Sequence, residues 1–443
     1  MDNNGYSSNN EIDQEAGNNL HPNRSKHESE QTKGIFLFGV IGGIAISALT
    51  AGFVYVGIGL FGIFPIKKAA PANTKNVAEG MEEVHVVNDD TIAKLETIED
   101  VIDQYYYQED DIDTANMIEW MYAGMVASLG DPYSVYYTQE EWADLIEDTE
   151  GIYYGIGAYI SLDTNTGLAR ISGVIKDTPA ERAGLRENDL IYLIDGESVT
   201  GYELSEVVAK VKGEDGTLVH LTIYRDGEPD YLEVDVVREQ IETPTVSYEM
   251  LDGGIGYISI SEFDDVTVDQ FTDAMAVIKG SGAKGLILDL RGNPGGRLTA
   301  VVDIARQLLP KGLIVYTEDK NGQRTEYSCD GKNELQIPLV VLVNRNSASA
   351  SEILAGAVKD YGIGTLVGVK TYGKGIVQRI LPLTDGTALK LTVSAYYTPK
   401  GNNIHNIGIE PDIECELDTE AYYADGEDSQ LERAIEEVRK MMN

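Results

Sequence analysis

A run of small hydroxyl side chains stands where the chain is expected to enter a helix. In NRNSASASEILAG, residues 344–356, Ser347, Ser349 and Ser351 alternate with alanine. Ser349 is followed three residues later by Glu352 and then by an apolar helical pattern, which is typical of a capping box. The start of a helix also offers free N–H groups and a positive dipole end that can stabilise an oxyanion. The segment therefore fits either a helix cap or a serine nucleophile, and the local sequence leaves both open.

A serine nucleophile needs a neighbour that removes its proton, and histidine is the usual base. Of the five histidines, only His405 belongs to the same predicted domain as the serines. It stands in a loop rich in glycine and asparagine, where a lone histidine is more often a surface residue. A Ser–His hydrolase that uses His405 is therefore retained as a minor alternative.

Lysine can act as the base when burial lowers its pKa enough to leave the amine neutral. The segment VGVKTYGKGIVQRI supplies Lys370 and Lys374, and Lys374 stands between two glycines that let another segment approach closely. Gln378, four residues further on, shares a face with Lys374 on a strand or a helix and so can orient its amine. A solvated turn is the commoner place for such a lysine, so the segment by itself does not establish a base.

The elements around these residues are typical of an α/β domain over residues 241–420. GIGYISISEF and KGLILDLRGN are expected to be strands, the second with the continuous apolar run of a strand buried on both faces. LQIPLVVLVN is another buried strand, and it leads directly into the serine repeat. A serine at such a strand-to-helix junction is presented outward by the sharp turn. A charged amphipathic helix at 421–443 is expected to serve packing or a dimer contact.

Residues 150–240 have a different pattern, with short β-like runs separated by turns and a single helix. Within that helix, apolar side chains follow the i, i+3, i+4, i+7 spacing and form one face: Leu204, Val207, Val208 and Val211. We expect a compact β-rich module with this helix beside its groove.

The N-terminal part contains an uncharged apolar run at residues 34–64. About 20 apolar residues suffice to span a bilayer, and the long polar leader at 1–33 without a clear cleavage site favours an uncleaved anchor over a signal peptide. Residues 65–90 are expected to be a linker and 91–149 a small helical region. Lysine and arginine flank the apolar run on both sides and mark the orientation weakly. We expect a single-pass protein of the cell membrane with its large C-terminal part outside the cytoplasm.

Composition excludes some classes of function. The chain has 443 residues, of which 74 are acidic and 34 basic, giving a net charge of −40. The length predicts several domains, and the charge argues against binding to nucleic acid, whose phosphates it would repel. Cys329 and Cys415 lack the spacing of metal ligands, so no metal site is expected. Whether the two cysteines pair is left open.

One block of motifs resembles a known binding domain. The order GIG, TPAERAGLRENDLIYLIDGESV and then the amphipathic helix is similar to a PDZ domain of the circular type found in exported proteases. Such domains bind a peptide C-terminus as an added strand and hold its carboxylate with the N–H groups of a glycine-containing loop. The resemblance places that loop at Tyr154, Gly155, Ile156 and Gly157. Arg186 is a candidate contact for acidic or carboxylate groups, although a surface charge is the more common role for such a residue.

A wider set of motifs resembles a family of enzymes. SASASE, GVKTYGKGIVQ and LKLTVSAYYTPKGNNIHNIGIEPD, preceded by LGDPYSVYY and LDLRGNPGG, are similar to the carboxyl-terminal processing proteases, also called tail-specific proteases. The similarity extends over residues 90–415 in the family's domain order. It implies a serine peptidase that needs neither a metal nor an organic cofactor.

The same resemblance implies roles for individual residues. Ser349 corresponds to the nucleophile, Lys374 to the general base and Gln378 to the residue that positions the lysine. The main-chain N–H groups of Gly295 and Ala350 correspond to the oxyanion donors. Glycine in particular lets a main-chain N–H approach the scissile carbonyl closely.

The sequence therefore predicts a multidomain α+β protein with an N-terminal transmembrane helix, a small helical region, a PDZ-like β-rich module, an α/β protease core and a C-terminal helix. We expect a membrane-anchored serine endopeptidase that recognises the C-terminal tails of extracytoplasmic proteins. A homodimer through the helices near residues 95 and 435 is a further expectation. The alternative is a catalytically inactive PDZ scaffold that binds protein C-termini. Whether the PDZ-like module gates the active site is left open.

Overall fold

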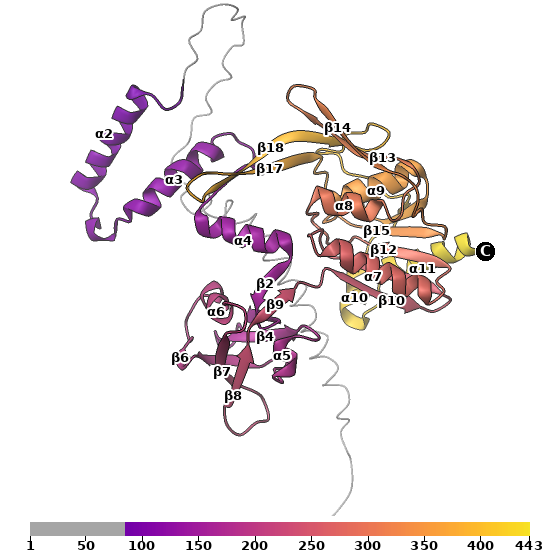
Figure 1. Ribbon diagram of the computed structural model, residues 1–443, viewed down its shortest axis with the longest axis horizontal. Coiled ribbons are helices and arrows are strands. Elements are labelled where there is room, and N and C mark those ends of the chain that lie inside the picture. The colour runs from indigo at the N-terminus through magenta and orange to yellow at the C-terminus, as the bar shows by residue number, and fades with distance from the viewer. Residues whose placement is uncertain (1–84) are drawn as a thin grey trace, which may run out of the picture.

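The computed structural model describes residues 85–443 (Figure 1), which form a helical N-terminal segment, a β-rich module and an α/β core. The anchor expected at 34–64 and the polar tail at 1–33 lie outside the described residues, as does most of the linker. Among residues 85–443, the helices are all too short or too polar to cross a membrane.

The N-terminal segment is mainly helical. Its helix α2 begins at a capping box, in which the Asn88 side chain accepts the Thr91 N–H at 3.0 Å. Helices α2 and α3 project away from the rest of the molecule (Figure 1), and neither contains a buried side chain. The elements of the segment are α2 (Asp89–Tyr105), η1 (Glu109–Asp111), α3 (Thr114–Ala127), β1 (Val135–Tyr137) and α4 (Gln139–Glu150).

Strand β1 joins this segment to the core. It pairs antiparallel with β18 (Ala388–Tyr397), so that Val135 lies opposite Lys390. The sequence prediction for 91–149 named only helices, because a strand of three residues is too short for its alternation to be recognised. The residues just before β1 are consequently held against the core.

The β-rich module contains a sheet in the order β3-β4-β5-β7-β8 and a separate pair, β2-β9. Helix α6 buries Val207 and Val211 against the sheet, on the apolar face that the spacing predicts. Strand β3 is an edge strand of its sheet. The elements are β2 (Ile152–Gly155), β3 (Ala158–Leu162), β4 (Ala169–Val174), α5 (Pro179–Arg182), β5 (Leu190–Ile194), β6 (Glu197–Ser198), α6 (Leu204–Val211), β7 (Leu218–Tyr224), β8 (Leu232–Val237) and β9 (Glu239–Glu242).

The α/β core is built on a sheet in the order β10-β11-β12-β15-β16-β19, parallel except for β10. Helices α7, α8 and α9 cover one face and α11 covers the other. The elements of this layer are β10 (Val246–Leu251), β11 (Ile255–Ile260), α7 (Thr267–Gly280), β12 (Gly285–Asp289), α8 (Leu298–Ala305), β15 (Leu339–Val343), α9 (Ala350–Tyr361), β16 (Gly364–Gly368), β19 (Ile413–Glu414), α10 (Thr419–Asp425) and α11 (Ser429–Met442).

The central strands have continuous apolar runs because helices cover both faces of the sheet. In β15, Val341 and Val343 pack with helices α7 to α9, whereas Val340 and Leu342 face Ala434 and its neighbours on α11. Successive side chains of a strand point to opposite faces, so a strand covered on both sides must be apolar at every position. The prediction of buried strands from KGLILDLRGN and LQIPLVVLVN is confirmed in this way.

A second sheet lies beside the core. Its order is β1-β18-β13-β14, with β17 paired to β18. The long β17–β18 hairpin reaches from the core toward α3 and α4 (Figure 1). Cys329 is buried at the end of β14, and Cys415 follows β19; both are free thiols. The remaining elements are β13 (Gly312–Asp319), β14 (Arg324–Cys329) and β17 (Ile376–Pro382).

Candidate active site

Two loops meet at one edge of the core sheet, because β12 and β15 are neighbouring parallel strands whose carboxyl ends lie together. The Ser347 hydroxyl donates to the carbonyl of Leu290 at 2.8 Å, and the Ser351 hydroxyl donates to the carbonyl of Asn293 at 3.1 Å. Both serines are fully buried. The two outer serines of the repeat therefore hold the two loops together through hydrogen bonds.

Ser349 is presented differently. It precedes the first residue of α9 with φ 52° and ψ −111°. A positive φ is rare for a residue with a Cβ, and strain of this kind gathers at functional turns. Ser349 lines a cleft and is partly exposed. The middle serine is thus the member of the repeat that a substrate can reach.

A buried carboxylate connects the serine turn to the lysine loop. Glu352 is fully buried, and one of its oxygens accepts the main-chain N–H groups of Ser349 (2.9 Å) and Lys374 (2.8 Å). The other oxygen accepts the Thr371 hydroxyl (2.5 Å) and the Gly373 N–H (2.8 Å). The capping box predicted the first of these contacts. The other three join segments far apart in the sequence and fix the lysine loop against the start of α9.

Lys374 lies in the loop before β17 and lines the same cleft as Ser349. Burial lowers the pKa of Lys374, and the charge of Lys390 lowers it further, whereas Asp131 and Glu352 act in the opposite direction. Removing an ammonium from water disfavours its charged form. The environment therefore moves this amine toward the neutral form that a base requires.

The amine of Lys374 rests over the ring of Tyr133, with Nζ 4.7 Å from the ring centre. The hydrogen bonds of residues 85–443 include none between the side chains of Ser349 and Lys374. Lys370, the other lysine of the segment, forms a surface ion pair with Glu410 at 2.8 Å. Of the two lysines, only Lys374 is placed in the cleft.

Gln378 lies on β17 and also lines the cleft. Its Nε2 donates to the hydroxyl of Thr392 on β18 at 3.1 Å, and not to Lys374. The pairing of β17 with β18 shifts register between Val377 and Gln378. Gln378 is therefore in the same site as Lys374, with its amide directed to the neighbouring strand.

The two expected oxyanion donors lie beside Ser349. The hydrogen bonds of the described chain leave the Ala350 N–H, at the first residue of α9, without an acceptor. Gly295 has φ 113°, and a Cβ on it would stand 2.7 Å from the Ser349 Cβ, so only glycine fits there. Its N–H donates to the Asn293 side chain at 2.8 Å. One donor is thus free, and the other is engaged by a neighbouring amide.

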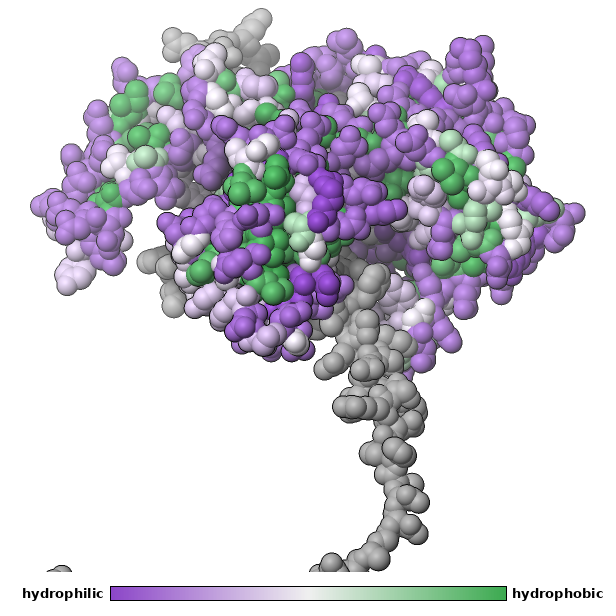
Figure 2. Space-filling model, turned by 60° about the horizontal axis from the view of Figure 1, so that its bottom comes forward, coloured by the Kyte–Doolittle hydropathy of each residue, from purple (hydrophilic) through white to green (hydrophobic). Residues whose placement is uncertain are grey.

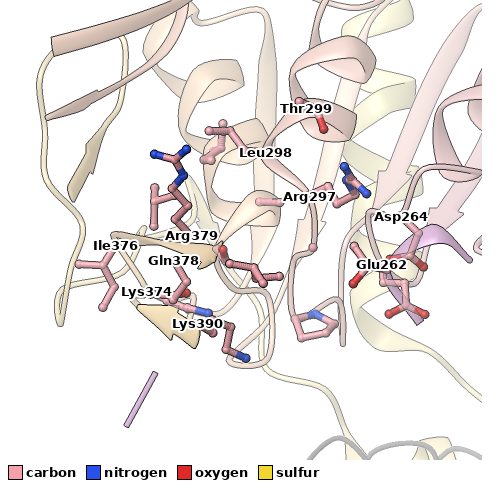
Figure 3. Close-up of a pocket in the computed structure, with 18 of the residues that line it drawn as sticks. Glu262, Asp264, Arg297, Leu298, Thr299, Lys374, Ile376, Gln378, Arg379 and Lys390 are labelled. Atoms are coloured by element: carbon pink, nitrogen blue, oxygen red, sulfur yellow. The ribbon is translucent and has the colours of Figure 1, made fainter. Parts of the chain in front are cut away.

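The cleft has a volume of about 1180 Å³. Figure 3 shows Lys374, Gln378, Arg379 and Lys390 gathered on its β17–β18 side. Glu262, Asp264 and Arg297 lie on the opposite side. A cleft of this size can enclose several residues of an extended peptide.

His405 is not among the described residues that line this cleft. The main chain of His405 packs against Gly375, because a Cβ added to Gly375 would stand 2.5 Å from the main-chain nitrogen of His405. The ring nitrogen Nδ1 of His405 is buried without a hydrogen-bond partner. The geometry gives no support to the Ser–His alternative.

The expected carboxylate-binding loop lies in the β-rich module. Tyr154 and Gly155 pair with β9, and Ile156 and Gly157 then lead into the edge strand β3. Gly157 has φ 80°, and a Cβ there would stand 2.3 Å from the Cβ of Thr178. The glycine that the motif supplies is therefore required by the backbone. Arg186 is exposed, as expected.

Comparison with known proteins agrees with this arrangement. The chain matches the family model described as Peptidase family S41 over residues 254–415 and that of the PDZ domain over residues 170–225. Residues 48–141 match the model described as the Activating protease CtpB N-terminal domain. The three matches follow each other in the order of the structural parts.

Relatives resemble most of the chain. The carboxy-terminal processing protease CtpA of Bacillus subtilis is 37% identical over 330 residues, which cover 74% of this chain and 70% of the relative. CtpB of the same organism is 35% identical, covering 81% of this chain and 74% of the relative. A solved photosystem II D1 C-terminal processing protease is 30% identical with a TM-score of 0.43, covering 74% and 94% of the two chains. Because the two Bacillus subtilis proteases are 35–37% identical over most of their own length, the protein belongs to peptidase family S41 and is a carboxy-terminal processing serine protease with a PDZ domain.

Proposed function

We propose that this protein is a membrane-anchored endopeptidase that binds the C-terminal tails of extracytoplasmic proteins and cleaves them through a Ser–Lys acyl-enzyme mechanism. The observation that supports this mechanism most is the buried Glu352 carboxylate, which accepts the N–H groups of both Ser349 and Lys374. One anion thus holds the proposed nucleophile and the proposed base at a single cleft.

In this mechanism, the Ser349 hydroxyl attacks the scissile carbonyl and the neutral amine of Lys374 takes its proton. The free N–H of Ala350 stabilises the oxyanion, and the Gly295 N–H joins it once it turns from the Asn293 side chain. Lys374 then protonates the leaving amine, and a water molecule, deprotonated by the same lysine, hydrolyses the acyl-enzyme. Since no hydrogen bond joins the Ser349 and Lys374 side chains in this conformation, one of them must move toward the other for the first proton transfer.

The PDZ domain would capture the substrate tail. Strand β3 is an edge strand, and α6 lies beside it. A peptide added along β3 would bring its terminal carboxylate to the loop at Tyr154, Gly155, Ile156 and Gly157. Hydrogen bonds of the described residues leave the N–H groups of Ile156 and Gly157 without an acceptor, as a carboxylate-binding loop requires.

The membrane part of the proposal rests on sequence alone, because residues 34–64 lie outside the described residues. Their uncharged apolar composition matches a single anchor. With the C-terminal part outside the cytoplasm, a protease added to intact cells should degrade it. Degradation that requires lysis would reverse the proposed orientation.

The dimer is proposed through the projecting helices. Both helices expose apolar side chains (Figure 2), whereas α11 already packs Ala434 and Val438 against the core sheet. We therefore assign a dimer contact to α2 and α3 and not to α11, and sedimentation of the Trp120→Glu variant tests it. The exposed apolar residues of the two helices include Ile92, Leu95, Ile98, Val101, Met117, Trp120, Met121 and Met125.

One assay tests the function. Cleavage of a peptide by the intact protein is compared with that by the Ser349→Ala, Lys374→Ala and His405→Ala variants. We expect the first two variants to lose cleavage and the third to retain it. Peptide binding should persist in Ser349→Ala and should weaken when the peptide C-terminus is amidated.

The competing expectations predict other results. A catalytically inactive scaffold would bind the tail but show no cleavage in any variant, and neither the family nor the geometry favours it. A Ser–His hydrolase would lose cleavage in His405→Ala and keep most of it in Lys374→Ala.

A further inference from the structure

The segment just before β1 lies against the proposed base. Strand β1 pairs with β18, and the N–H of Thr392 on β18 donates to the Ser134 hydroxyl at 3.1 Å. Ser134 is buried. The turn that ends α3 is thereby fixed beside the β17–β18 hairpin, although it lies outside the part of the chain that matches the peptidase family model.

Two side chains of this turn act on the Lys374 amine. The ring of Tyr133 lies under Nζ at 4.7 Å from its centre, within the range of a cation–π interaction. The Asp131 carboxylate accepts the Tyr133 N–H at 3.1 Å and the Ser134 hydroxyl at 2.6 Å. Asp131 therefore holds Tyr133 in place and brings a negative charge near the lysine.

Thr392 links this turn to Gln378. Its main-chain N–H donates to Ser134, and its hydroxyl accepts the Gln378 amide at 3.1 Å. Burial would raise the pKa of Asp131, but hydrogen bonds from Ser134 and Thr392 outweigh it and lower the pKa. The carboxylate is therefore ionised at neutral pH.

We propose that Asp131 and Tyr133 are positioning residues for the general base, holding the Lys374 amine and stabilising the ammonium that forms when it takes the Ser349 proton. The inference rests on the proposed Ser–Lys function. It gives the N-terminal segment a part in the proton transfer. The ring supplies a negative face and the carboxylate supplies a charge, and both favour the protonated amine.

Other charged groups near the amine determine in which direction each substitution shifts the pKa of Lys374. Lys390 on β18 opposes protonation of Lys374, and Glu352 on α9 favours it. Burial and a hydrogen bond with Tyr372 raise the pKa of Tyr133 to about 12, so this ring stays neutral in the assay range. Removing Asp131 and removing Lys390 must therefore shift the apparent pKa of the base in opposite directions.

The experiment measures kcat and kcat/KM against pH for the full chain and its variants. In Asp131→Asn, we expect the acid limb of the profile to move down by about half to one pH unit and the plateau kcat to fall about 10-fold. In Lys390→Met the acid limb should move to higher pH, because a charge that opposes protonation of Lys374 is removed. Asp385→Asn, a carboxylate at the β17–β18 turn that does not act on Lys374, is the matched control and should not move it.

The ring is tested separately. Tyr133→Leu should lower kcat about 3- to 30-fold at little change in KM, and Tyr133→Phe, which keeps the ring face, should restore most of the loss. A merely structural role would lower the plateau without shifting the limb. An unshifted limb in Asp131→Asn, or equal kcat in Tyr133→Leu and wild type, overturns the proposal.

Failure of the inference can be told from failure of the proposed function. If Lys374→Ala remains active, the Ser–Lys function itself is wrong. If Lys374→Ala is inactive while the Asp131 and Tyr133 variants behave as wild type, only the positioning role is wrong. Should Asp131→Asn fail to fold, the two Tyr133 variants still decide: a kcat loss in Tyr133→Phe as large as in Tyr133→Leu overturns the proposal.

Discussion

The carboxylate of Glu352 accepts the main-chain N–H of Lys374 at 2.8 Å, from the first turn of the helix that follows Ser349. The residue that caps the serine helix is therefore also the residue that holds the lysine loop. Serine and lysine lie in separate segments of the chain, and this buried carboxylate joins them, together with the hydrogen bond from the Tyr372 N–H to the Ser347 carbonyl at 3.1 Å.

Replacing Glu352 by glutamine should uncouple the two loops. The glutamine amide nitrogen cannot accept, so one pair of buried donors loses its partner, and each such donor costs about 1–3 kcal/mol. We expect a lower free energy of unfolding and a kcat reduced by a larger factor than tail-peptide affinity. Chemical denaturation and steady-state kinetics measure both. Asp303→Asn, which removes an exposed pair with Arg306, should change stability by less than about 0.5 kcal/mol; equal effects of the two variants would contradict the role of Glu352.

Gly295→Ala should abolish cleavage. The new Cβ would stand 2.7 Å from the Ser349 Cβ and 2.9 Å from the Ala348 carbonyl oxygen, and overpacking of this kind costs about 1–3 kcal/mol. Alanine keeps the main-chain N–H, but a backbone shift that moves this donor away from the oxyanion would cost about 100-fold in kcat. Gly292→Ala is the matched control, because that glycine also has a positive φ but open space around it. The account would be contradicted by a Gly295→Ala enzyme as active as Gly292→Ala.

Lys374→Met should stabilise the fold while removing activity. Burial depresses the pKa of Lys374 below 10.5, so the folded state binds fewer protons than the unfolded chain and the amine destabilises the fold at neutral pH. The variant should therefore unfold at a higher temperature than wild type at pH 7, and the difference should shrink as the pH approaches 10.5. Thermal unfolding across this range checks it. Lys370→Met, at an exposed ion pair, should show no such trend.

Asp264 should make stability depend on pH. Burial, together with Glu262 and Asp148, raises the pKa of Asp264 to about 8, and its Oδ2 is buried without a hydrogen-bond partner. The folded state holds a proton that the unfolded chain has lost, so this carboxyl destabilises the fold increasingly as pH rises from about 4 to 8. Asp264→Asn should be more stable than wild type above pH 8 and equal to it near pH 4. A constant difference across pH, seen by denaturant unfolding, would rule this out.

Sequence patterns predicted the helices and strands whose periodicity is strong. They did not predict contacts between residues far apart in the chain. The buried strands around KGLILDLRGN and LQIPLVVLVN and the apolar face of α6 were predicted, because each pattern reports its own local environment. Strand β1 was missed, since three residues carry no period. The contacts of Glu352 with the lysine loop and of Tyr133 with Lys374 were also missed. These contacts depend on tertiary packing, and no spacing within one segment encodes them.

Among the site residues, too, the sequence predicted which residues belong to the site but not the contacts that tertiary packing gives them. Ser349 and Lys374 came from a motif resemblance, and the structure brings them to one cleft. Their roles stay predictions. The orientation of Gln378 toward Thr392 and the engagement of the Gly295 N–H by Asn293 could not be foreseen, because each depends on a side chain brought close by another strand or loop.

The central claim is that Ser349 forms a covalent acyl-enzyme. A peptide with an activated ester would make acylation faster than deacylation, so that the acyl-enzyme accumulates, and acid quenching followed by mass spectrometry of the digested protein would locate the adduct. We predict one acyl group on the segment that contains Ser349, and none in the Ser349→Ala variant. An adduct on another residue, or cleavage by Ser349→Ala at the wild-type rate, would contradict the account.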